Sequence, residues 1–192
     1  MDNNNTLIII GVIVAILVIA GLVLAWMRYR TERLRSRFGP EYVRTVEEAG
    51  GQRQAEAQLQ DRAARVRKYD LKPLAAADRE RFADDWRRVQ AKFVDDPAGA
   101  ARDADSLLGE VMSARGYPMA DIDQRLEDVS VDHSEAVQNY RLARDIFARH
   151  GRGDAGTEDL RQAMINYRTL FQDLLGEPDR TPTKPEAEVR YA

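Results

Sequence analysis

The feature that most constrains this chain is an uncharged apolar run near its N-terminus, residues 7–26, LIIIGVIVAILVIAGLVLAW. At about 1.5 Å of helical rise per residue, the run spans roughly 30 Å, the hydrocarbon thickness of a bilayer. Its many Leu, Ile and Val residues favour insertion by roughly 4 to 8 kcal/mol, taken as an upper bound. We therefore predict a transmembrane helix over residues 7–27, preceded by a short extracytoplasmic tail, residues 1–6.

The residues after the apolar run carry an orientation signal. Five arginines follow within residues 28–37, opposed only by Glu32, whereas MDNNNT at the N-terminus has almost no net charge. Because positively charged flanks stay in the cytoplasm, we predict a single-pass protein of the bacterial inner (plasma) membrane with its N-terminus outside and its body cytoplasmic. We expect the junction to bind anionic lipid headgroups. The predicted interface and orientation residues are Trp26, Arg28, Tyr29, Arg30, Arg33, Arg35 and Arg37.

Two further interpretations of the apolar run stay open. The first is an exported or outward-facing envelope protein, tethered by an uncleaved signal anchor. A cleaved signal is disfavoured, because the run is too long and lacks a basic segment before it; only a weak cleavage pattern occurs at Val18-x-Ala20. The second is a homodimer through the membrane helix, since Gly11 with Ala15 and Gly21 with Ala25 form small-xxx-small pairs.

Composition limits the function classes. The chain has no cysteine, which excludes disulfides and thiolate metal sites, and its net charge of −3 argues against nucleic-acid binding. His133 and His150 would lie about 25 Å apart on one helix, too far to share a metal. Paired acids are typical of helix caps and solvated faces. We therefore expect a non-enzymatic protein without metal or cofactor, with an enzyme using an unrecognised carboxylate or His site as an alternative.

The rest of the chain shows helical patterns separated by Gly and Pro, which predicts an all-α fold. A basic juxtamembrane and helical stalk region, residues 28–70, is broken at Phe38-Gly39-Pro40 and Gly50-Gly51; its segment 52–69 is a stalk, a coiled coil or a docked arm. A small antiparallel helical bundle, residues 71–176, and a disordered tail, residues 177–192, follow. The predicted bundle helices are 78–94, 97–115, 133–149 and 158–175, with a short turn or helix near 121–128 and caps at Asp96, Asp132 and Thr157.

Five short motifs are spread over the chain: FGPEY (38–42), FVDDP (93–97), RGYP (115–118), SVDH (130–133) and TEDLRQA (157–163). Together they resemble a family of small bacterial single-pass proteins, described as membrane or secreted proteins without an assigned activity. The resemblance implies no catalytic residue and no cofactor. We therefore expect a membrane-anchored interaction or scaffold module with a protein partner still to be identified. Its contact surface is expected in a groove around Trp86 and Tyr117, or on the thin apolar stripe of residues 52–69.

Overall fold

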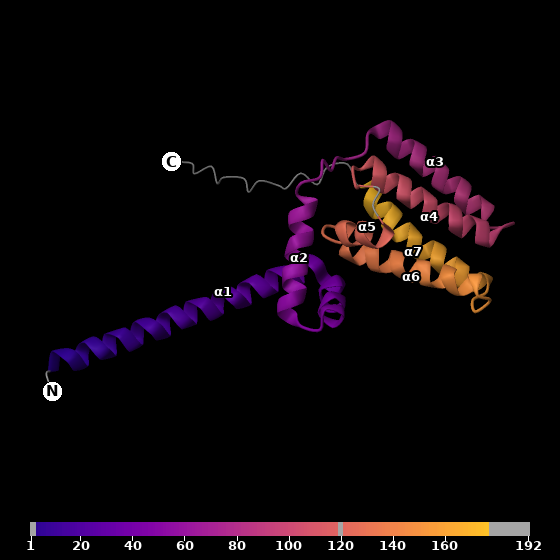
Figure 1. Ribbon diagram of the computed structural model, residues 1–192. Coiled ribbons are helices and arrows are strands. Elements are labelled where there is room, and N and C mark those ends of the chain that lie inside the picture. The colour runs from indigo at the N-terminus through magenta and orange to yellow at the C-terminus, as the bar shows by residue number, and fades with distance from the viewer. Residues whose placement is uncertain (1–2, 119–120, 177–192) are drawn as a thin grey trace, which may run out of the picture. The chain divides into compact units, whose positions relative to one another are not determined.

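The structure is a computed structural model that describes residues 3–118 and 121–176, with side chains described from Gly11 onward. The described residues form helices and no strand, which confirms the all-α prediction (Figure 1). The predicted tail, residues 177–192, lies outside the described residues. The chain divides into two compact units, Met1–Asp61 and Arg62–Ala192.

The first unit contains α1, Asn3–Ala49, and most of α2, Gln52–Val66. Helix α1 is bent at Gly39, whose φ of 44° and ψ of −122° are not helical, so the predicted break at Phe38-Gly39-Pro40 is present. Glycine permits this conformation because it has no Cβ. After a second turn at Gly50, α2 packs back against α1 (Figure 1). The buried side chains of this unit include Phe38, Tyr42, Thr45, Ala55 and Leu59.

The second unit is a helical bundle. Its helices are α3, Ala76–Lys92, α4, Pro97–Ala114, a short α5, Ile122–Val129, α6, Ser134–Gly151, and α7, Thr157–Leu175. Helix α4 packs against α3 and against α7, and α7 also packs against α6 (Figure 1). These bounds lie close to the predicted ones. Stacked aromatic rings contribute to the core: the centroids of Trp86 and Phe171 are 4.6 Å apart. Tyr140 and Tyr167 are 5.4 Å apart in a tilted arrangement.

The helix caps differ in part from expectation. Asp96 caps α4 as predicted, because its carboxylate accepts a hydrogen bond of 2.8 Å from the backbone of Gly99. The predicted cap at Asp132 is wrong, because His133 occupies the N-cap position of α6. The turn that follows α5 includes His133, whose amide donates a hydrogen bond to the Val129 carbonyl. Thr157 is likewise the first residue of α7, and Gly156 precedes it as N-cap.

The RGYP motif closes α4 and connects it with two other segments. Gly116, with φ of 96°, forms a Schellman turn in which its own amide and that of Tyr117 donate to the carbonyls of Ser113 and Met112. A Cβ at Gly116 would stand 2.3 Å from the carbonyl oxygen of Asp70, so only glycine fits there. Arg115 donates a 2.6 Å hydrogen bond to the carbonyl of Leu174 in the last turn of α7, where a cation is favourable.

Candidate functional site

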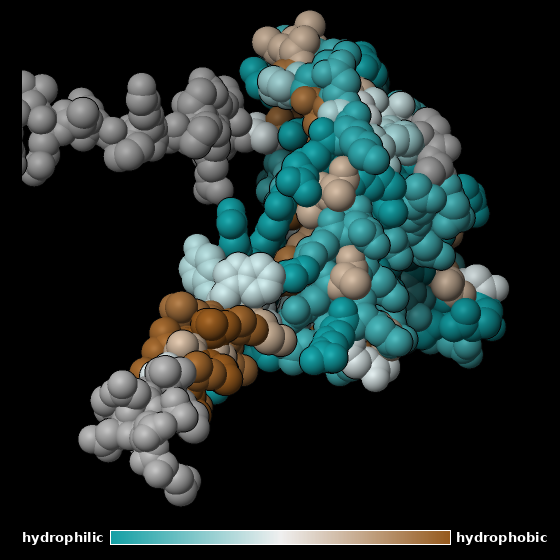
Figure 2. All heavy atoms as spheres, turned by 60° about the vertical axis from the view of Figure 1, so that its left-hand side comes forward, coloured by the Kyte–Doolittle hydropathy of each residue, from teal (hydrophilic) through white to brown (hydrophobic). Residues whose placement is uncertain are grey.

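The most exposed apolar surface lies on α1. The large side chains from Val12 to Met27 are nearly all aliphatic, and each of them is 42–66% exposed in the structure. By length and composition, the helix is able to cross a membrane. Figure 2 shows these apolar side chains gathered on the helix, whereas the remaining surface is mostly hydrophilic. Because the side chains of a soluble helix of this hydrophobicity would be buried, the exposure is consistent with a lipid-facing segment.

The predicted interface residues follow on the same helix. The rings of Trp26 and Tyr29 are largely exposed, as expected for aromatic residues at a lipid–water interface. The arginines have different surroundings. The guanidinium of Arg30 lies 5.4 Å from the ring centroid of Trp26 and donates a hydrogen bond to Gln60 of α2. The guanidinium of Arg35 lies 5.3 Å from the ring centroid of Tyr42.

A hydrogen-bonded cluster around Glu56 joins α1 to α2. One oxygen of the Glu56 carboxylate accepts hydrogen bonds from Thr31 at 2.8 Å, Gln52 at 2.9 Å and Tyr42 at 3.1 Å. Burial by itself would raise the pKa of Glu56, but these three hydrogen bonds and the positive charge of Arg30 outweigh it and hold the pKa below its ordinary value. The cluster therefore fixes the helix that carries the arginines against α2.

The predicted contact surface at Trp86 and Tyr117 is not a surface in this structure. The two side chains are only 5% and 3% exposed, and both belong to the bundle core. Trp86 stacks on Phe171, whereas Tyr117 is enclosed where the Schellman turn folds it inward. Burial raises the pKa of the Tyr117 hydroxyl to about 12, assisted by the nearby Asp132 carboxylate. Both residues therefore stabilise the fold, and a partner would have to bind elsewhere on the bundle.

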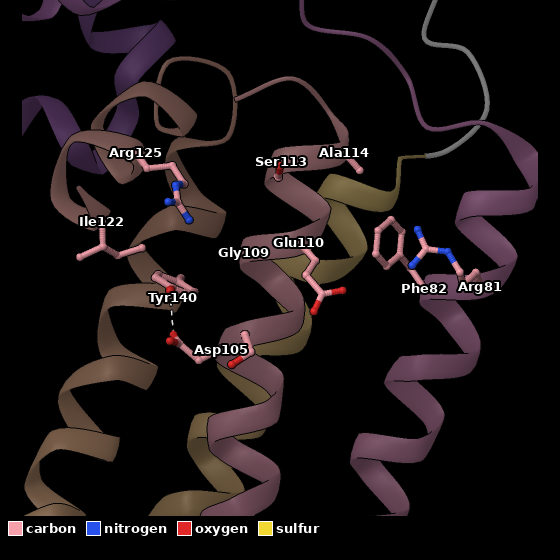
Figure 3. A pocket seen from close by; sticks show the side chains of 11 residues that line it. Arg81, Phe82, Asp105, Gly109, Glu110, Ser113, Ala114, Ile122, Arg125 and Tyr140 are labelled. Atoms are coloured by element: carbon pink, nitrogen blue, oxygen red, sulfur yellow. Dashed lines mark hydrogen bonds between the residues drawn. The ribbon is translucent and has the colours of Figure 1, made fainter. Parts of the chain in front are cut away.

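An open groove of about 510 Å³ lies along α4 (Figure 3). Arg81 and Phe82 of α3 stand on one side of it, and Arg125 and Ile122 of α5 stand on the other. The small residues Ser106, Gly109 and Ser113 line it from α4, together with the carboxylates of Asp105 and Glu110. The groove therefore combines apolar patches with charges of both signs, as protein contact surfaces do.

One side of the groove is held by a partly buried hydrogen bond. The hydroxyl of Tyr140 on α6 donates to the carboxylate of Asp105 on α4 at 2.7 Å (Figure 3). Burial, together with the Asp105 charge, raises the pKa of Tyr140, so this hydroxyl stays protonated at neutral pH. Arg81 lies over the ring of its neighbour Phe82, with 4.2 Å between the guanidinium carbon and the ring centroid. Glu110, which also lines the groove, takes part in neither of these contacts.

A second cluster of charges, which the sequence did not reveal, lies partly buried beside α5. The Asp128 carboxylate, 1% exposed, accepts hydrogen bonds of 2.7 Å from Arg65 and from the Tyr69 hydroxyl. Its neighbour Glu127 pairs with the buried Arg62 at 3.1 Å. Burial and the hydrogen bond to Asp128 raise the pKa of Tyr69. We call these five residues the α5 ion cluster; it fastens residues 62–69 to the bundle.

The two histidines lie apart and have separate partners. His133 makes a 2.7 Å contact through Nδ1 with the carboxylate of Asp173, and Nδ1 of His150 contacts the carbonyl oxygen of Ala155 at 2.8 Å. The first contact joins the start of α6 to the end of α7, and the second joins the last turn of α6 to the loop before α7. Within residues 3–118 and 121–176, no group of three or more His, Asp or Glu side chains is arranged to hold a metal ion.

Comparison with known proteins adds no relative: no family model matches the chain, and no curated protein or solved structure is significantly similar to it.

Proposed function

We propose that this chain is a non-enzymatic, single-pass protein of the bacterial inner membrane whose helical bundle serves as a protein-interaction or scaffold module in the cytoplasm. The observation that carries the proposal is the junction on α1. A membrane-length apolar segment of α1 with exposed side chains ends at Trp26, and a run of arginines begins at Arg28 on the same helix. A positively charged flank on the C-terminal side favours a cytoplasmic body.

The absence of cysteine from the chain allows a direct test of this orientation. Thr169 lies exposed on α7 outside the groove, so Thr169→Cys introduces a single thiol into the bundle, and Asn5→Cys introduces one before the apolar run. In cells with a permeabilised outer envelope but an intact inner membrane, an impermeant maleimide should label Asn5→Cys and leave Thr169→Cys unlabelled until the membrane is broken. The reverse pattern would establish the outward-facing body instead.

The partner surface that we propose is the groove along α4. It is concave, and it exposes the charged Arg81 and Glu110 as well as the apolar Ile122, so it offers both shape and charge for recognition. The surface replaces Trp86 and Tyr117, which the structure buries.

Site-specific photocrosslinking in native membranes tests this surface. A photoreactive residue at Ser113, in the groove, should give a discrete protein adduct. The same residue at Arg168, exposed on α7 and outside the groove, serves as the matched control and should give none. Equal adduct patterns at both positions, or none at either, would overturn the groove as the partner surface.

A further inference from the structure

The five arginines after the apolar run do not have equivalent surroundings. Arg30 and Arg35 are occupied within the protein, by Gln60 and Trp26 in the first case and by Tyr42 in the second. Arg28 and Arg33 are exposed, and neither guanidinium makes a hydrogen bond or ion pair with another residue that the structure describes. The exposed pair is therefore available to a ligand outside the protein.

The depth of these residues identifies the ligand. With Trp26 at the edge of the hydrocarbon, Arg28 lies about 3 Å and Arg33 about 10 Å further along the helix axis. The headgroup layer of each leaflet is roughly 5–7 Å thick. Arg28 thus lies within this layer, and the long side chain of Arg33 is able to reach back into it. At this depth the available anions are lipid phosphates.

We propose that Arg28 and Arg33 each bind the phosphate group of an anionic lipid in the cytoplasmic leaflet. Arg30 instead holds the helix against α2 through Gln60, and Arg35 lies over Tyr42 of α1 beyond the bend at Gly39. These two arginines add little to lipid binding. A guanidinium binds a phosphate through paired hydrogen bonds as well as charge, which suits it to this contact. The inference rests on the proposed membrane anchoring, and it divides four of the five arginines into a lipid-binding pair and a protein-binding pair.

The test compares two double variants of the full chain, reconstituted in phosphatidylcholine vesicles that contain phosphatidylglycerol. Arg28→Gln with Arg33→Gln removes the proposed lipid contacts, and Arg30→Gln with Arg35→Gln removes the same charge from the same run. Spin-labelled phosphatidylglycerol and phosphatidylcholine then report the preference of the protein for the anionic lipid. Because a basic residue near the surface contributes roughly a fivefold preference, we expect at least that value for the wild type.

In the first variant the preference should fall below about twofold, and in the second it should keep most of its wild-type value. Equal losses in both variants would show that only net charge matters, and a wild type without preference would show that no anionic site exists; either result overturns the inference. Extraction of the membranes with alkaline carbonate separates these outcomes from failure of the proposed function. If the wild type leaves the membrane on extraction, the anchoring itself is wrong.

Discussion

Removing the carboxylate of Asp128 tests whether the α5 ion cluster stabilises the bundle. In the Asp128→Ala variant, Arg65 and Tyr69 both lose an acceptor that lies 2.7 Å away in the structure. A hydrogen bond to a charged group contributes about 1.5–3 kcal/mol, and two such bonds are lost. The side chain of Arg65 is 34% exposed, so water replaces part of what it loses, and Glu127 remains within 3.4 Å of it. We therefore expect a loss near the lower end, about 3 kcal/mol.

Urea unfolding of the full chain in mild detergent measures this loss. Only two tryptophans are present, so a Trp26→Phe background leaves Trp86, stacked on Phe171 in the core, as the fluorescent reporter of the second unit. A loss of about 3 kcal/mol should also lower the melting temperature by roughly 10 °C for a unit of this size. The matched control is Asp145→Ala, because Asp145 pairs with Arg149 at 3.1 Å but is 66% exposed; we expect a change of less than about 0.5 kcal/mol.

A double-mutant cycle of Asp128→Ala with Arg65→Met separates the interaction energy of the two side chains from the other effects of each substitution. If Asp128 and Arg65 stabilise the bundle as a pair, the double variant should lose about 2 kcal/mol less than the sum of the two single variants. Additive losses, or an Asp128→Ala variant as stable as the Asp145→Ala control, would refute the role of the cluster.

Three further perturbations have defined outcomes. Gly116→Ala should destabilise the bundle by about 3 kcal/mol in urea unfolding, because its Cβ meets Asp70 at 2.3 Å; Gly153→Ala, at φ of 86° with open space around it, should cost only about 1 kcal/mol. Because the pKa of Glu56 is lowered in the folded state, its contribution to stability is present above pH 4.5 and is lost as the pH falls. The free energy of unfolding, measured by circular dichroism in urea, should therefore fall less steeply with acid in Glu56→Gln than in the wild type. Because burial raises the pKa of Tyr117 from 10.0 to about 12, its contribution to stability is complete below pH 10 and is lost as the pH rises toward 12. Tyr117→Phe should therefore lose less helix content than the wild type when the pH is raised, as measured by circular dichroism.

The sequence predicted the helices well, because each begins or ends at a residue that restricts the backbone. Asp96-Pro97 starts α4 within the predicted register, and Gly116 ends it with a positive φ. Capping by Asp132 and Thr157 was less predictable, since several polar residues stand in a row at both helix starts. Which of them occupies the N-cap depends on where the preceding turn ends, and that is decided by backbone hydrogen bonds such as the one from His133 to Val129.

The candidate sites were harder to predict, because periodicity shows which face of a helix is apolar but not which polar residue another element will cover. Trp86 and Tyr117 are amphipathic, and only packing on Phe171 and the turn at Gly116 buries them. Asp128, in contrast, is one acid among many in the sequence, on a short polar helix. In the structure Arg65 and Tyr69, which stand more than fifty positions earlier in the chain, donate hydrogen bonds to it.

The same reasoning separates the arginines of the α1 junction, which are alike in the sequence. Charge alone assigns all five to orientation, because the positive-inside rule counts charges and does not distinguish their partners. The structure distinguishes them, since folding at Gly39 and Gly50 brings α2 back to Arg30 while leaving Arg28 exposed on the same helix. A basic run against which a later helix packs therefore divides its charges between protein and lipid. Lipid selectivity should then follow the position of a substituted arginine more closely than the net charge of the run.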